Sequence, residues 1–218
     1  MPFKAFAFDA YGTLFDVHAA IARHRQAMGP EAEAFSALWR LKQLEYSWTR
    51  SLMGRTFDFW TLTGHALDFC FARFPGVDPA LRGPLLDAYY NLDAFADVRP
   101  VLEAVRAARL RAVIFTNGTS AMAEAAARSA GIDGLVEGVV SVETLGAFKT
   151  VPEAYRLVHE RLELVPGEVA LVSSNRWDVA GATAFGMPAI WVNRTGQPDE
   201  YADLAPVKVI AGLAGLLE

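Results

Sequence analysis

The chain has 218 residues, of which 53% are apolar, and a formal net charge of −5, so it is long enough for one large globular domain or a domain with an insertion. The negative charge argues against nucleic acid or an anionic membrane as a partner but is compatible with a small anionic substrate. The single Cys70 excludes an internal disulfide and a multi-cysteine metal site, and with no signal peptide or membrane-spanning stretch expected, it favours a cytoplasmic protein.

The first predicted element is a buried strand that ends at a carboxylate. Residues 5–8 are apolar with aromatic side chains at alternate positions, and Asp9 follows them just before a turn at Gly12. Ligands of open parallel sheets bind beyond the carboxyl ends of the strands, so Asp9 is well placed for chemistry. A simpler alternative is that Asp9 only caps the turn.

Residues 17–96 differ from the rest of the chain. They contain no convincing strand and place Trp, Phe, Leu and Ala at helical spacing, which predicts a helical insertion. Breaks between its helices are expected at 28–30 and 74–79, and 98–100 mark the return to the other pattern.

Strands and helices then alternate, which is typical of an α/β fold with a parallel sheet covered on both faces. The predicted strands are 111–118, 139–142, 169–174 and 189–192. The predicted helices are 101–108, 121–130, 153–162 and 179–185, and residues 211–217 end the chain.

Polar residues follow several of the predicted strands. Besides Asp9, they are Thr116 and Asn117 in one group and residues 173–175 with Asp178 in another, while Lys149 precedes a predicted helix. In a parallel sheet these groups would share one edge, and such convergence is more specific than one polar strand end.

This constellation resembles the haloacid dehalogenase superfamily. The superfamily has an Asp after its first strand, a hydroxyl after its second, a Lys and a final polar loop, which match Asp9, Thr116, Lys149 and residues 173–178. The resemblance implies a doubly wound, Rossmann-like parallel-sheet core formed by residues 1–15 and 97–218. Residues 16–96 would be an all-helical cap domain inserted after the first strand.

Two features of the sequence argue against the phosphatases of this superfamily. Those enzymes carry a second Asp two residues after the nucleophile as a proton donor, but this chain has Tyr11 there, and a halide leaving group needs no proton. Ser174 and Asn175 also stand where magnesium-binding acids are expected, which should weaken magnesium binding. A magnesium-dependent phosphatase and a catalytically inactive binding protein remain the alternatives.

Three segments, residues 9–14, 40–46 and 173–178, look like signatures of the L-2-haloacid dehalogenases. This resemblance implies hydrolysis of short-chain L-2-haloalkanoic acids to D-2-hydroxy acids without a metal or other cofactor. It also implies a small-molecule 2-haloacid as the partner, no nucleic acid or membrane partner, and a homodimer.

The same resemblance implies a role for each matching residue. Asp9 would be the nucleophile, Lys149 would keep it ionised, and Asp178 would activate water. The remaining expected site residues are Asn175, Ser173 and Thr13 around that water, Arg40 and Asn117 for the halide, Tyr11, Leu44, Phe59 and Trp177 in an apolar pocket, Thr116 for the substrate carboxylate, and Tyr155 as a supporting hydrogen-bond donor.

Some positions depart from the pattern or allow a simpler interpretation. Thr116 stands where these dehalogenases often have Ser, and Thr150 where Pro is usual. Without the resemblance, Arg40 would be a solvated residue or a partner of Glu45, and Trp177 and Phe59 would be core. Arg176 is expected to point to solvent and is assigned no role.

Overall fold

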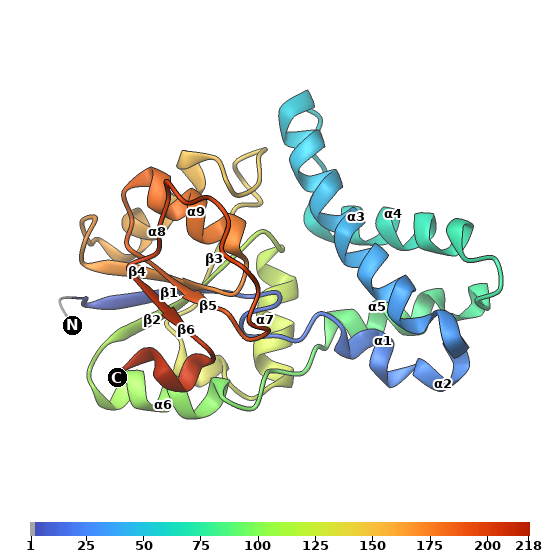
Figure 1. Ribbon diagram of the computed structural model, residues 1–218, viewed down its shortest axis with the longest axis horizontal. Helices are drawn as coiled ribbons and strands as arrows, with labels where there is room; N and C mark the ends of the chain where they lie inside the picture. Colours follow the sequence, from blue (N-terminus) through green and yellow to red (C-terminus); the bar gives the residue numbers. More distant parts are fainter. Residues whose placement is uncertain (1–2) are drawn as a thin grey trace.

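The computed structural model describes residues 3–218 and contains a six-stranded sheet in the order β3-β2-β1-β4-β5-β6 (Figure 1). Neighbouring strands are all parallel. The strands are β1 (Ala5–Asp9), β2 (Arg111–Thr116), β3 (Val139–Ser141), β4 (Val169–Ser173), β5 (Ala189–Val192) and β6 (Lys208–Ile210). The predicted α/β fold with a parallel sheet is confirmed.

Strand β1 lies at the centre of the sheet, and all of its residues are buried. It pairs with β2 on one side, where Asp9 is opposite Phe115, and with β4 on the other, where Phe8 is opposite Val172. Because all three strands run the same way, the loops that follow them leave at one edge of the sheet. The predicted convergence of the polar groups at this edge is therefore confirmed.

Helices cover both faces of the sheet (Figure 1). One face carries α8 (Pro152–Leu162) and α9 (Arg176–Phe185). The other carries α6 (Val98–Ala107), α7 (Ser120–Ser129), and the 3₁₀ helices η3 (Asp133–Leu135) and η4 (Leu213–Leu216). A strand covered on both faces reads as a continuous apolar run, as β1 and β4 do.

The remaining helices form a lobe beside the sheet, which we call the helical lobe, residues 19–90 (Figure 1). Its helices are α1 (Ala19–Arg23), α2 (Arg25–Met28), α3 (Ala32–Met53), α4 (Phe59–Arg73) and α5 (Arg82–Tyr90), with the 3₁₀ helices η1 (Gly29–Glu31) and η2 (Pro79–Leu81). Helix α3 packs along α4, and the Nε1 atom of the buried Trp39 donates to the Thr63 carbonyl across this contact.

The two connections between the lobe and the sheet run side by side. The backbone N–H of Asp16 donates to the Asp93 carbonyl at 2.9 Å, and that of Phe95 donates to the Leu14 carbonyl at 3.0 Å. Two backbone hydrogen bonds therefore hold the connections together.

The structure corrects several predicted boundaries. Helix α6 begins earlier than predicted, at Val98, because Pro100 lies in its first turn, where the missing N–H costs no hydrogen bond. Helix α9 also begins earlier, at Arg176, so Asp178 is in its first turn. Strand β6 was missed because it is a short edge strand with a half-buried Lys208 and an exposed Val209. Within residues 3–218, no helix combines the length and apolarity that crossing a membrane requires.

Candidate active site

Asp9 lies at the carboxyl end of β1 with only 5% of its surface exposed. Thr13 Oγ1 and Asn175 Nδ2 both donate to Asp9 Oδ2 at 2.8 Å. Lys149 Nζ donates to the other oxygen, Oδ1, at 3.1 Å. These donors stabilise negative charge on the carboxylate and fix its orientation.

Lys149 is fully buried and makes its contacts at the centre of the site. Its Nζ also donates to Asp178 Oδ2 and to the Phe115 carbonyl, both at 2.9 Å, and lies 3.9 Å from the centre of the Phe115 ring. An ammonium group has three hydrogens, and the two carboxylates and the carbonyl account for all of them.

Asp178 is fully buried on the far side of Lys149, and Tyr155 donates its hydroxyl to Asp178 Oδ1 at 3.0 Å. Burial raises the pKa of the Asp178 carboxyl above its ordinary value; Lys149 opposes this effect, and the negative charge of Asp9 adds to it. Burial, together with the charge of Asp178, also raises the pKa of Tyr155. A carboxylate with a raised pKa is a better proton acceptor, which suits a general base.

The loop after β4 binds the loop after β1. The backbone N–H of Ser174 donates to Thr13 Oγ1 at 2.8 Å, and that of Asn175 donates to Ser173 Oγ at 3.2 Å. Asn175 Nδ2 bridges Asp9 Oδ2 and the Tyr11 carbonyl, at 2.8 and 3.1 Å. Asn175 is the N-cap of α9, but its side chain makes no capping hydrogen bond; its Nδ2 donates to Asp9 and to the Tyr11 carbonyl.

The end of β2 supplies two buried polar side chains. Thr116 Oγ1 accepts a hydrogen bond from the Gly118 N–H at 2.9 Å, and Asn117 Oδ1 accepts one from the Lys149 N–H at 2.9 Å. Asn117 thus fixes the backbone that carries Lys149.

The helical lobe reaches the site through Arg40 and Phe59. Arg40 Nη2 donates to the Tyr11 carbonyl at 3.2 Å, whereas Glu45 pairs with Lys42. The alternative pairing of Arg40 with Glu45 is therefore wrong. Leu44 is half-buried one turn of α3 beyond Arg40, on the same face of the helix.

Tyr11 packs within an aromatic cluster between the sheet and the lobe. Its ring stacks on Tyr89 at 5.7 Å and on Phe59 at 6.2 Å between ring centres. Burial, with the neighbouring Tyr89, raises the pKa of Tyr11 well above its ordinary value, so its hydroxyl stays neutral near pH 7. The aromatic side chains that stack on Tyr11 thus come from the helical lobe, whereas Tyr11 itself follows the central strand.

Sequence reasoning missed two residues in this cluster, Tyr89 and Gln43. Tyr89 donates its hydroxyl to the buried Gln43 at 3.3 Å. Gln43 was detectable, because a polar residue one turn after Trp39 falls on the apolar face of α3.

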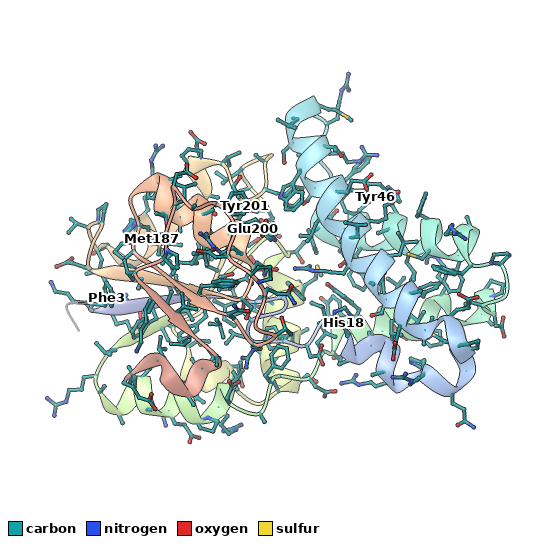
Figure 2. All side chains as sticks on the ribbon, in the orientation of Figure 1. Phe3, His18, Tyr46, Met187, Glu200 and Tyr201 are labelled. Atoms are coloured by element: carbon teal, nitrogen blue, oxygen red, sulfur yellow. The ribbon has the colours of Figure 1, made fainter. Side chains whose placement is uncertain are left out.

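Two clefts meet at Trp177. One, of about 640 Å³, includes Arg40, Asn175 and Trp177, with His18 and Glu200 among its other lining residues. Figure 2 shows His18 at the junction of the lobe with the sheet and Glu200 on the sheet side. The other cleft, of about 450 Å³, is mainly apolar and includes Trp48, which packs edge-on against Trp177.

The expectation that Arg176 points to solvent is wrong. Arg176 is 5% exposed; its Nε donates to Asp199 at 2.6 Å, and its Nη2 donates to the carbonyls of Tyr201 and Leu204. Arg176 therefore holds the segment 199–204 against the start of α9. Arg176 can be buried because a carboxylate and two main-chain carbonyls accept hydrogen bonds from its guanidinium group.

Within residues 3–218, no three His, Cys, Asp or Glu side chains form a metal-ligand cluster. The NH₂ group of Asn175 bridges Asp9 Oδ2 and the Tyr11 carbonyl. A cation that used these two oxygens would have to displace this donor. The donor set of the site thus suits an anionic or neutral ligand better than a divalent cation.

Comparisons with known proteins agree with this geometry. The haloacid dehalogenase-like hydrolase family matches residues 3–186. The (S)-2-haloacid dehalogenase 1 of Pseudomonas sp. (strain CBS-3) is 43% identical over 92% of this chain and 89% of its own. A crystal structure of a dehalogenase with an intermediate complex superimposes with a TM-score of 0.96 at 39% identity, over 99% of this chain and 96% of that one.

A further solved structure bears on the chemistry. The L-2-haloacid dehalogenase of Xanthobacter autotrophicus, with chloropropionic acid covalently bound, superimposes with a TM-score of 0.89 at 34% identity, over 98% of this chain and 96% of that one. Both the fold and the sequence thus match dehalogenases along almost the whole chain. The chain therefore belongs to the haloacid dehalogenase-like hydrolases, within the branch that contains the (S)-2-haloacid dehalogenases.

Proposed function

We propose that this protein hydrolyses short-chain L-2-haloalkanoic acids to D-2-hydroxyalkanoic acids and halide through an ester on Asp9. The observation that carries the proposal is the setting of Asp9, whose carboxylate is buried and held by Thr13, Asn175 and Lys149 at the central strand end. The similarity to (S)-2-haloacid dehalogenases supports the substrate class. The division into core (1–15 and 97–218) and cap (16–96) is part of the proposal.

In the first step, a carboxylate oxygen of Asp9 attacks C2 of the substrate from the side opposite the halogen. A carbon–oxygen bond forms while the carbon–halogen bond breaks, the halide leaves with the electron pair, and C2 is inverted. The halide needs no proton, so Tyr11 in place of an acid is no obstacle. Arg40 and the NH₂ group of Asn117, whose oxygen is bonded to Lys149, are our proposed halide donors.

The substrate has two further parts to place. Its carboxylate would bind the Thr116 hydroxyl and the backbone N–H groups of the turn after Asp9, since such turns present unpaired donors. Its alkyl group would pack on the aromatic and aliphatic side chains of Tyr11, Leu44, Phe59 and Trp177. Tyr11 and Phe59 already stack together there.

In the second step, water attacks the carboxyl carbon of the Asp9 ester. Asp178 takes a proton from this water and passes it to the alkoxide of the product as the ester bond breaks; the new Asp9 carboxyl group loses its proton to solvent. Asn175, Ser173 and Thr13 would position the water. Tyr155 supports Asp178 through its hydrogen bond.

The contacts of Asn175 weigh against the magnesium-dependent phosphatase, because its amide bridges Asp9 and the Tyr11 carbonyl. The inactive binding protein is less well supported, because Lys149 and Asp178 keep a buried charged network around Asp9 at an energetic cost that binding alone does not require.

The homodimer and the cytoplasmic location stay predictions. Exposed apolar side chains on the helical lobe provide a candidate dimer surface: Leu41, Leu52, Met53, Phe57 and Phe69. Sedimentation of the purified protein tests the dimer.

The first experiment measures halide release from L- and D-2-chloropropionate, each with EDTA and with added Mg²⁺. We expect release from the L isomer only, unaffected by EDTA. Magnesium-dependent phosphate release from a generic ester without dehalogenation would overturn the proposal. In a single turnover in ¹⁸O-water, the label should enter Asp9, and Asp9→Asn should abolish turnover.

A further inference from the structure

Arg194 lies outside the proposed catalytic set but binds both connections between the helical lobe and the sheet. Its Nη1 and Nη2 donate to the two carboxylate oxygens of Asp97 at 2.7 and 3.0 Å, and Nη2 also donates to the Thr13 carbonyl at 3.1 Å. The guanidinium lies 4.3 Å from the centre of the Phe95 ring. Thr13 belongs to the first connection, and Phe95 and Asp97 belong to the second.

Asp97 is held from a further direction. The backbone N–H of Leu213, at the start of η4, donates to Asp97 Oδ2 at 2.8 Å. The Arg194–Asp97 pair therefore joins the segment after β5, the two connections and the C-terminal helix. Arg194 also lines the cleft of about 640 Å³.

The contact with Thr13 leads directly to the nucleophile. Thr13 donates its hydroxyl to Asp9 Oδ2 at 2.8 Å and accepts a hydrogen bond from the Ser174 N–H at 2.8 Å. The carbonyl of the same residue is held by Arg194. If the carbonyl is released, the Thr13 backbone can shift, and its hydroxyl no longer has one fixed position beside Asp9.

We propose that Arg194, paired with Asp97, is a positioning residue that keeps Thr13 and the first connection in place for the attack by Asp9. This inference rests on the proposed function for its kinetic consequences. A lysine cannot replace the arginine fully, because one ammonium cannot reproduce the planar, two-pronged contact with a carboxylate and a carbonyl.

The chain contains a matched control at the opposite edge of the sheet. Arg111, the first residue of β2, donates to both oxygens of Glu137 and to the Leu162 carbonyl at 2.7 Å. This arrangement has the same chemistry, a carboxylate plus a main-chain carbonyl, but no contact with the Asp9 network.

The test compares Arg194→Met, Arg194→Lys and Asp97→Asn with Arg111→Met. Misplaced catalytic groups can cost about 10²-fold, so we expect Arg194→Met to lower kcat by roughly 10- to 100-fold with KM changed less than about threefold. Arg194→Lys and Asp97→Asn should fall between Arg194→Met and wild type. Arg111→Met should leave kcat unchanged even where it lowers Tm.

Two further measurements separate positioning from general stability. Removing the Thr13 hydroxyl should cost much less in the Arg194→Met background than in wild type, because the two changes disrupt one contact chain. Amide hydrogen exchange of residues 10–16 should accelerate in Arg194→Met and not in Arg111→Met.

An Arg194→Met protein with wild-type kcat, or with unchanged exchange in residues 10–16, would overturn the inference. If wild type releases no halide from L-2-chloropropionate, the proposed function fails; the exchange measurement still tests the contact of Arg194 with Thr13.

Discussion

Lys149 Nζ lies 3.1 Å from Asp9 Oδ1 and 2.9 Å from Asp178 Oδ2, so one buried ammonium is shared by two carboxylates. When both acids are ionised, one positive charge faces two negative charges, so the three groups carry a net negative charge. This imbalance agrees with the raised pKa of Asp178, to which burial contributes most. The proposed nucleophile and base are thus coupled through one cation, so a change in the charge of one carboxylate should alter the pKa of the other.

Lys149→Met should remove the cation and leave two carboxylates facing each other. We expect halide release to fall by about 10²–10³-fold or more, as for the loss of a preorganised charge-stabilising donor. Unfolding should become easier by about 3–5 kcal/mol, the usual cost of removing one partner of a buried ion pair. Halide assays and urea unfolding measure both. Lys208→Met is the control, since that Nζ donates to the Gly215 carbonyl, and normal activity in Lys149→Met would contradict the assignment.

Tyr155→Phe should move the pH dependence of turnover. The hydrogen bond from Tyr155 lowers the pKa of Asp178, although burial raises it overall. Without that bond the pKa of Asp178 rises further. Asp178 then stays protonated, and inactive as a base, up to a higher pH than in wild type. The acid limb of the kcat profile should therefore shift to higher pH. A shift to lower pH, or none while kcat falls at every pH, would rule out this coupling.

Asp178→Asn should change how the stability of the fold depends on pH. Because the folded pKa of Asp178 is raised, its contribution to stability is complete below the ordinary pKa and is lost as pH rises through the folded value. The neutral variant does not lose this contribution, so the Tm of the variant minus that of wild type should increase as pH rises from about 3 to 7. Removing one partner of the buried Lys149 pair lowers Tm at every pH, so the change of the Tm difference with pH is the measurement. A Tm difference that stays constant or falls as pH rises would contradict the prediction.

Gly181→Ala should lower activity by displacing Tyr155, which supports Asp178. A Cβ at position 181 would overlap the Tyr155 hydroxyl and lie 3.0 Å from the Thr150 methyl group. Tyr155 must then move away from Asp178, so the variant should reproduce the pH shift of Tyr155→Phe, and the double variant should add little. Gly64→Ala is the control, because a Cβ there meets only Arg82 Nη2 at 3.6 Å and should leave activity unchanged.

The sequence predicts most of the core because its signals are local. The strand ending at Asp9 and the polar residues after β2 and β4 are read from short apolar runs that stop abruptly. Their shared edge follows from parallel pairing alone. Strand β6 lacks such a run, because an edge strand need not be apolar on both faces.

Contacts between segments that are far apart in the chain could not be predicted from the sequence, because local patterns do not show which segments meet. Arg176 looks like a surface residue until Asp199 and the carbonyls of Tyr201 and Leu204 are brought to it. Thr150, where Pro was expected, also makes a contact that no local sequence pattern indicates. Its methyl group lies close to Gly181 of α9. The roles of the candidate site residues stay predictions.

The central position of β1 has a consequence for biosynthesis. Its neighbours β2 and β4 are made long after it, and Asp9 acquires its distant partners, Lys149 and Asn175, only when these residues have left the ribosome. Pairings so distant along the chain form late and slowly. The apolar first strand therefore has no strand partner until β2 and β4 have been synthesised. Dehalogenation by Asp9 would in turn require that the whole core has assembled.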